Sequence, residues 1–279
     1  SRRVGEKIVE ESLPKLLKLY SKYDIKSTFF VLGSFANSFP EAISMISEEG
    51  HEIASHGFSH EVKHGFDVMS LEDQTRHLAL SKKILEKLSN QDVVSFRSPA
   101  LRLNHKTVKA LIDTGFLIDS SISPKRLDFF LSYGSRNKWN WLDCPNLPYF
   151  MSKNTPYKAG NSNIFEIPVS AFIFGFIGST MRSSPFIFER ICKKILAESV
   201  SMNKPIVFLF HPNELIAHSP GKIIKRSRSF LNYIVKDYLR SNIKSRNLGD
   251  DCYHLLENLI IRFKSAGFKF ITAKSYYEI

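Results

Sequence analysis

The sequence is poor in three features that would define other protein classes: cysteine, long apolar runs and acidic side chains. Its 279 residues contain only 3 cysteines, Cys144, Cys192 and Cys252, which lie far apart and form no CxxC pair. A disulfide framework is therefore not expected, and the three thiols are expected to be small core residues. The longest apolar run, residues 171–177, is well below the about 20 residues that a membrane-spanning helix needs.

Basic residues outnumber acidic ones by 39 to 27, and the net charge is +12. Much of the excess lies in residues 222–248, which hold eight basic residues against the single acid Asp237. We expect a basic helical insertion there, either a solvated surface segment or a contact for an anionic glycan or a membrane surface. No nucleic-acid partner is expected, because aromatic and glycine residues are not interleaved with these charges in a recognition pattern.

Short apolar segments alternate with amphipathic ones, and 43% of the residues are hydrophobic. This alternation predicts an α/β fold with a parallel sheet, open or closed into a barrel, in one domain over residues 1–279. The segment 128–163 has no periodicity and is expected to be a long functional loop. The sequence places strands at 27–32, 52–55, 92–96, 116–119, 164–169, 206–210 and 268–271, and helices at 4–22, 40–49, 70–88, 104–114, 186–200 and 251–266.

The most informative segment is GHEIASHGFSHE at residues 50–61, which places His56 and His60 four residues apart after a predicted strand. Residues i and i+4 lie on one side of a helical turn, so two imidazoles at this spacing can face one point. Imidazole nitrogens are common ligands of zinc and similar divalent ions. The pair predicts a metal site that activates water for hydrolysis.

Two further polar side chains follow predicted strands. Arg97 follows the strand at 92–96 in FRSPA, and His211 follows the strand at 206–210 in FLFHPNEL. In a parallel α/β sheet, the groups of an active site gather at the carboxyl ends of the strands. We therefore expect His56, Arg97 and His211 to meet at one rim of the sheet.

The segments GHEIASHGFSHE, FRSPA, GFLIDSSISP and FLFHP resemble, in their order and spacing, the motifs of the polysaccharide deacetylases, the NodB-homology group of carbohydrate esterases. The resemblance covers most of the chain, and the HxxxH element in its GHEI context is the specific part. It implies a distorted (β/α) barrel with seven strands and a divalent metal, commonly Zn²⁺, with Co²⁺ or Ni²⁺ also tolerated at such a site. The implied reaction removes N-acetyl groups from an N-acetylated glycan.

The resemblance also implies residue roles. His56 and His60 match the two histidine ligands of the metal, Arg97 matches the arginine that orients the catalytic base, and His211 matches the general acid. Pro99, Asp119 and Trp141 are candidate substrate-binding residues. For Asp119 the alternative is a cap of the turn that follows its strand, and for Trp141 it is an anchor of its loop.

The chain departs from the family pattern at one motif. The family has a short acidic motif at the end of its first barrel strand, which supplies the base and a third metal ligand. No strand with such a motif precedes the first predicted helix, and Asp67, Asp119 and Asp143 sit in no matching motif. We expect N-terminal truncation of the barrel rather than true loss of catalysis, because the other motifs are intact.

The missing motif predicts weak metal binding and little turnover for the chain as written. Two other functions stay open. One is hydrolysis of a C–N bond in a non-sugar amide such as a cyclic ureide, and the other is glycan binding without catalysis.

Overall fold

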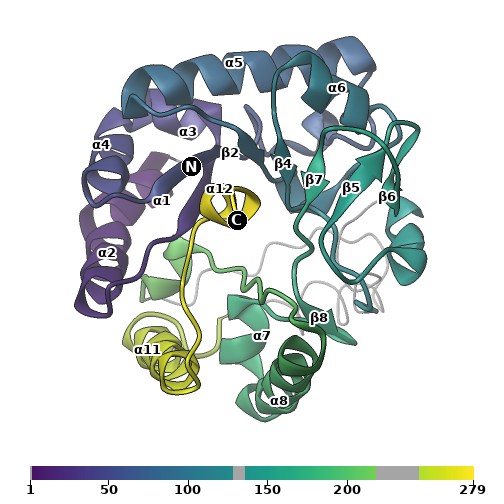
Figure 1. The fold of residues 1–279 in the computed structure, drawn as a ribbon. Helices are drawn as coiled ribbons and strands as arrows, with labels where there is room; N and C mark the ends of the chain where they lie inside the picture. Colours follow the sequence, from purple (N-terminus) through teal and green to yellow (C-terminus); the bar gives the residue numbers. More distant parts are fainter. Residues whose placement is uncertain (1, 128–135, 218–244) are drawn as a thin grey trace, which may run out of the picture.

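A computed structural model describes residues 2–127, 136–217 and 245–279 of the chain. Helices surround the strands in a ring, and a short C-terminal helix lies in the middle of the view (Figure 1). The predicted basic insertion at 222–248 falls largely outside the described residues. None of the helices within the described ranges is long and apolar enough to cross a membrane.

The strands confirm the predicted α/β class with a mostly parallel sheet. Seven strands pair in the order β1-β2-β3-β4-β7-β5-β6. Neighbours from β1 to β4, and β4 with β7, are parallel, whereas β5 is antiparallel to both β6 and β7. The pairing does not close into a complete barrel over the described residues. The strands are β1 (Thr28–Val31), β2 (Glu52–Ser55), β3 (Ser95–Phe96), β4 (Ile118–Asp119), β5 (Tyr149–Ser152), β6 (Thr155–Ala159) and β7 (Phe165–Glu166), with a separate pair β8 (Ala171–Phe172) and β9 (Phe174–Gly175).

Helices cover the outside of this sheet, above all α5 and α6 on one side and α8 and α11 on the opposite side (Figure 1). The α-helices are α1 (Arg2–Lys7), α2 (Leu13–Lys22), α3 (Gly33–Ser38), α4 (Pro40–Glu48), α5 (Leu71–Ser89), α6 (Thr107–Asp113), α7 (Gly178–Ser183), α8 (Pro185–Met202), α11 (Asp250–Ser265) and α12 (Ala273–Tyr277). Short helical turns are η1 (Ile8–Ser12, a π-helix), η2 (Val62–His64), η3 (Pro99–Leu101), η5 (Arg136–Asp143) and η6 (Pro212–Leu215).

The predictions of regular strands at 206–210 and 268–271 are wrong. Residues 206–210 form only an isolated parallel bridge, between Leu209 and Ile177, and residues 268–271 have no strand assignment. The segment 206–210 still runs beside residues 170–178, because Ser170 N donates to Val207 O at 3.1 Å and Gly178 N donates to Leu209 O at 2.8 Å. These irregular contacts replace a continuous ladder on this side of the ring.

The predicted structureless stretch 128–163 is also corrected, because its second half forms the β5–β6 hairpin. Tyr149 and Phe150 of β5 pair with Glu166 and Phe165 of β7. The prolines and polar residues of the segment mask an alternation in which Tyr149 and Met151 are buried and Phe150 is exposed. The hairpin therefore extends the sheet beyond its parallel part.

Pro14 lies where the N-terminal helix is interrupted. The helical segment 2–22 is interrupted by the π-helical turn η1, immediately before Pro14 at the start of α2. A proline has no N–H for the i−4 carbonyl and its ring crowds that carbonyl. A wider turn at this point lets the helix continue on the other side.

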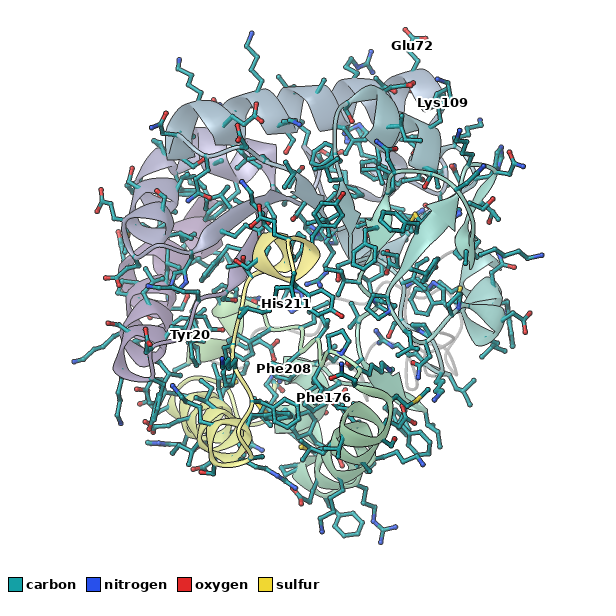
Figure 2. All side chains as sticks on the ribbon, in the orientation of Figure 1. Tyr20, Glu72, Lys109, Phe176, Phe208 and His211 are labelled. Carbon is teal, nitrogen blue, oxygen red and sulfur yellow. The ribbon has the colours of Figure 1, made fainter. Side chains whose placement is uncertain are left out.

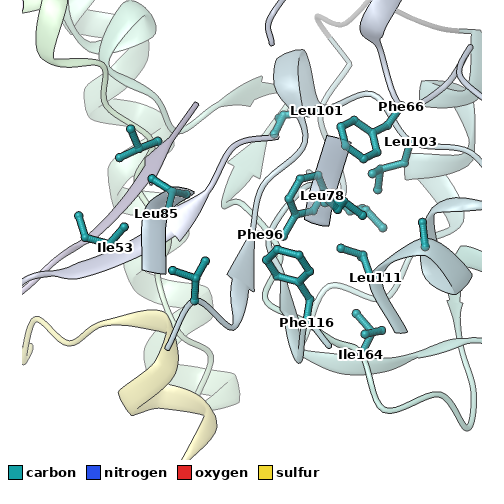
Figure 3. Packing of buried hydrophobic residues seen from close by; sticks show 14 of the residues in the cluster. Ile53, Phe66, Leu78, Leu85, Phe96, Leu101, Leu103, Leu111, Phe116 and Ile164 are labelled. Carbon is teal, nitrogen blue, oxygen red and sulfur yellow. The ribbon is translucent and has the colours of Figure 1, made fainter. Parts of the chain in front are cut away.

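The core beneath α5 and α6 is built from aromatic and aliphatic side chains of the strands β2 and β3, of the helices α5 and α6 and of the connecting loops (Figure 3). Phe96 of β3 packs against Phe66 and Phe116, with ring centroids 5.0 and 5.9 Å away, and all three are fully buried. Each such ring removes about 150–250 Å² from water, a large apolar contribution to stability. This packing fixes β3, whose carboxyl end carries Arg97.

A second apolar cluster lies on the opposite side of the ring, beneath α8 and α11. Phe176 stacks on Phe188 of α8 at 4.9 Å and meets Phe208 edge-on at 5.0 Å. Figure 2 shows Phe176 and Phe208 on the same side of His211. The aromatic packing holds the irregular segment 206–210, and with it the backbone that leads to His211.

Candidate active site at the carboxyl ends of the strands

His56 and His60 lie on the loop after β2, and their ring centroids are 5.6 Å apart. The helical turn predicted for them is wrong, because residues 56–61 form an irregular loop. Gly57 has φ of +73°, a left-handed conformation that glycine adopts without strain and that no α-helix contains. The loop is tied to the end of β1, since His56 N donates to Val31 O at 2.8 Å and Gly33 N donates to Gly57 O at 2.9 Å. The two imidazoles thus face each other without a helix.

One nitrogen of His56 is oriented by the neighbouring strand. Its Nδ1 bonds the backbone carbonyl of Arg97 at 2.6 Å, which makes Nδ1 the protonated nitrogen and leaves Nε2 with a lone pair. Burial, followed by repulsion from His60, lowers the pKa of His56 to about 3. The imidazole is therefore neutral near pH 7, the state that a metal ligand requires.

Arg97 is buried at the end of β3 and is held from three directions. Its Nε donates to Ser120 O at 2.7 Å and its Nη2 donates to Ser120 Oγ at 2.6 Å. Its guanidinium lies over the ring of Phe30, 4.1 Å from the centroid. Burial lowers the pKa of Arg97 to about 10 against the attraction of Glu166 and Asp119, so the group remains a cation near neutral pH.

Asp119 and Glu166 form a buried acidic pair beside Arg97. They are register partners on the parallel strands β4 and β7, and both are fully buried. Burial raises the pKa of Asp119 to about 6, and burial together with the charge of Asp119 raises the pKa of Glu166 well above its usual range. The two carboxyls therefore hold one proton between them near neutral pH. One negative charge remains to balance Arg97.

His211 follows the irregular segment 206–210 and lies near the middle of the ring of elements (Figure 2). Its side chain is 63% exposed, and its Nδ1 lies 3.4 Å from Glu214 Oε1. Burial is the largest cause of the lowered pKa of His56, and electrostatic effects of His60, Arg97 and His211 lower it further. The other three predicted groups, His60, Arg97 and His211, thus lie near enough to His56 to act on it electrostatically.

The predicted substrate-binding residues fare differently. Asp119 is fully buried, with Ser121 Oγ donating to its Oδ1 at 2.5 Å, and its substrate role stays a prediction. Trp141 is only 1% exposed and belongs to the core, which corrects the prediction that its ring stacks on a sugar. Trp139, at 61%, is the exposed tryptophan. Pro99 is buried in η3, beside two residues with positive φ, Ala100 and Leu101, and its substrate role stays a prediction.

The donor set for a divalent ion is present in part. Two imidazoles, one of them oriented through Nδ1 by a backbone carbonyl, fit the ligand type and outer-shell bonding of zinc sites. Within residues 2–127, 136–217 and 245–279, no third His, Cys, Asp or Glu joins them in a metal-binding group. The residues present thus fit two of the positions around such an ion.

The sequence analysis did not predict three residues of this region: Glu166, Arg182 and Glu214. Glu166 ends β7 opposite Asp119, and Glu214 follows His211 by three residues. The second spacing is that of a helix capping box, which could have indicated the contact. Nothing in the sequence near Arg182 signals its pairing with Glu214, because 32 residues separate them.

Comparison with known proteins agrees with the motifs. Residues 5–118 match the family model described as polysaccharide deacetylase. A peptidoglycan deacetylase of Helicobacter pylori is 31% identical over 113 residues, which cover 40% of this chain and 38% of that protein. A peptidoglycan deacetylase-like protein of Gibberella zeae is 36% identical over 113 residues, covering 39% of this chain and 32% of that protein. The match therefore spans less than half of these relatives' length.

Solved structures show the same fold at lower identity. A polysaccharide deacetylase structure from Mycobacterium smegmatis superposes with a TM-score of 0.57 and 22% identity, covering 75% of this chain and 66% of that one. A peptidoglycan N-acetylglucosamine deacetylase structure gives a TM-score of 0.50 at 17% identity, covering 95% of this chain and 81% of that one.

Residues 5–118 thus match the polysaccharide deacetylase family model, and they make up less than half of the chain. The matched range includes His56, His60 and Arg97, whereas His211 lies beyond it.

Proposed function

We propose that this protein is a metal-dependent hydrolase that removes N-acetyl groups from a polysaccharide, and that its substrate is a glycan of the peptidoglycan type. Three observations support the proposal: the rings of His56 and His60 lie 5.6 Å apart, the Arg97 carbonyl bonds His56 Nδ1, and His211 acts electrostatically on His56. The names of the relatives support the substrate class, because they include peptidoglycan deacetylases of Helicobacter pylori and Bacillus cereus.

His56 and His60 would hold the divalent ion, and zinc is the ion that two imidazoles favour among the biologically common ones. When bound, such an ion polarises the amide carbonyl and lowers the pKa of a bound water toward about 7. The bond from Nδ1 to the carbonyl of Arg97 keeps the His56 ring oriented. That fixed tautomer leaves Nε2 free to act as the ligand.

Arg97 acts through charge. Its guanidinium is rigidly held by Ser120 and Phe30, and a fixed cation keeps a neighbouring carboxylate ionised. In the proposed reaction, Arg97 holds the carboxylate that removes the proton from the attacking water. That carboxylate would come from the acidic motif of the family, and no such motif stands among these 279 residues.

His211 would supply the proton for bond cleavage. An amine anion is a very poor leaving group, so the sugar nitrogen must be protonated as the C–N bond breaks. The imidazole of His211 is exposed, and its Nδ1 lies 3.4 Å from Glu214 Oε1, so Nε2 is the nitrogen left for a substrate. From there it can donate to the departing nitrogen.

The test is acetate release from N-acetylglucosamine oligomers, measured with and without added Zn²⁺, for the wild type and for His56→Ala. The proposal expects slow release that depends on metal and is lost in the variant. Release from a panel of small cyclic amides, with none from the oligomers, would move the assignment to a non-sugar C–N hydrolase. Oligomer binding without any release would leave a glycan-binding protein.

A further inference from the structure

We infer that Glu214 is a positioning residue for His211: its buried carboxylate, held by Arg182, selects the tautomer of the imidazole and turns Nε2 toward the site. This inference deepens the proposed function and rests on it for the catalytic consequence, although the tautomer itself can be measured independently. The arrangement follows from three sets of contacts.

The first contact joins Glu214 to His211 through local backbone geometry. His211 has extended φ and ψ of −112° and 126°, and Pro212 starts the short helix η6 immediately after it. Glu214 stands at the third position of that helix, so its side chain reaches back to the residue before the helix. Its Oε1 lies 3.4 Å from both Nδ1 and the backbone N of His211.

The second contact joins Glu214 to Arg182 of α7. Arg182 Nε donates to Glu214 Oε2 at 2.6 Å, and the two side chains are only 6% and 5% exposed. Burial by itself raises the pKa of Glu214, but hydrogen bonds from His211 and Arg182 outweigh it, and the pKa is lowered. Glu214 is therefore a carboxylate near neutral pH, which accepts hydrogen bonds and donates none.

The third feature is the space that the carboxylate occupies. A Cβ placed on Gly178 would lie 2.7 Å from Glu214 Oε1 and 2.7 Å from Phe210 Cδ2, so a larger residue at that position would have to displace the carboxylate or the ring. The far side of Arg182 is fixed as well, because its Nη1 donates to Arg246 O at 3.0 Å and its carbonyl accepts from Asn247 Nδ2 at 2.7 Å. The Glu214 carboxylate is thus held in a tightly packed position next to His211.

The consequence concerns which nitrogen of His211 carries the proton. An acceptor beside Nδ1 requires a proton on Nδ1, so the neutral ring keeps its lone pair on Nε2. In the proposed reaction, Nε2 is then the nitrogen that carries the proton to the departing amine. A purely structural Arg182–Glu214 pair would leave the tautomer of His211 unselected.

The experiment is ¹⁵N NMR of the histidine side chains in the wild type and in Glu214→Gln, at a pH where His211 is neutral, with His211→Ala to assign the signal. The inference expects the Nδ1–H tautomer in the wild type and a substantial Nε2–H population in the variant, because the Gln amide can donate as well as accept. Glu198→Gln is the matched control, since it removes a poorly exposed carboxylate that pairs with Lys125 at 3.1 Å, away from His211. The control should keep the wild-type tautomer.

The kinetic arm uses acetate release. Glu214→Gln should lower kcat by at least about tenfold, within the range that general acid catalysis contributes, while KM stays nearly unchanged. An Nε2–H tautomer in the wild type, identical tautomers in both proteins, or a shifted tautomer with unchanged kcat would each overturn the inference. If the wild type releases no acetate, the function fails, but the tautomer measurement still decides the positioning claim.

Loss of charge pairing could prevent Glu214→Gln from folding, since Arg182 would then be buried without its partner. The double variant Glu214→Gln with Arg182→Leu removes that unpaired cation and allows the same NMR comparison. A retained Nδ1–H tautomer in the folded double variant would also overturn the inference.

Discussion

Asp119 and Glu166 meet side by side at the ends of neighbouring parallel strands, fully buried, with one proton between them and Arg97 alongside. Two adjacent carboxyls cannot both ionise at low cost in an interior. The arrangement therefore gives Arg97 a single negative charge to face, and it couples the stability of the sheet to pH.

The first prediction is that the protein loses stability as pH rises, through this pair. The folded pKa of Asp119, about 6, lies above the ordinary 3.8, so the pair's contribution is fully present below pH 3.8. It is lost as pH rises through about 6 and, for Glu166, beyond. Glu166→Gln should flatten the decline in unfolding free energy between pH 6 and 9, measured by urea denaturation. The exposed Glu72→Gln should follow the wild-type curve, and parallel curves for Glu166→Gln and wild type would refute the shared proton.

The second prediction concerns the rigidity of Arg97. Arg97→Lys loses both hydrogen bonds to Ser120 and the planar stacking on Phe30. We expect the unfolding free energy to fall by about 2–4 kcal/mol, because buried charged groups lose their partners. Arg76→Lys, at an exposed pair with Asp73, should change it by less than about 1 kcal/mol. Equal effects of the two substitutions would show that Arg97 is not specifically held.

The third prediction concerns the close packing of Gly178 against the Glu214 carboxylate. Gly178→Ala inserts a methyl group 2.7 Å from Glu214 Oε1 and Phe210 Cδ2. Overpacking of this kind typically costs about 1–3 kcal/mol, so the melting temperature should fall. Ser179→Ala at the next, half-buried position of α7 is the control and should have little effect. An unchanged melting temperature for Gly178→Ala would mean that Gly178 is not closely packed against Glu214 and Phe210.

The fourth prediction is metal affinity. His56→Ala or His60→Ala should weaken Zn²⁺ binding by more than the roughly 10–100-fold that loss of an outer partner costs, as measured by competition with a chelating dye. His105→Ala, at an exposed turn residue, should bind like the wild type. Zinc affinity that survives both substitutions would place the ion elsewhere on the protein.

Local sequence signals predicted the parallel part of the sheet well. The apolar run before His56 forms β2 at its predicted bounds, and Ser70 caps α5 by accepting a hydrogen bond from Asp73 N. These features depend on neighbours in sequence, through strand patterning and capping. The positions of His56 and Arg97 after β2 and β3 could therefore be predicted from these local signals.

Features that depend on distant partners were not predictable. Residues 206–210 have a strand-like composition. The neighbouring residues 170–178 pair with each other as the antiparallel strands β8 and β9, and only one β-bridge, Ile177 to Leu209, joins them to 206–210. Trp141 has the composition of a sugar-binding loop, and its burial is decided by the core that it joins. The Asp119–Glu166 and Arg182–Glu214 pairs join residues 47 and 32 positions apart, which no local pattern encodes.

The most direct test of the proposed site is anomalous diffraction at the zinc edge from crystals grown with Zn²⁺. The account predicts one strong peak within about 2.0–2.1 Å of a nitrogen of both His56 and His60, with Arg97 and His211 bordering the same space. A zinc peak at other residues, or none in a crystal where both imidazoles are ordered, would contradict it.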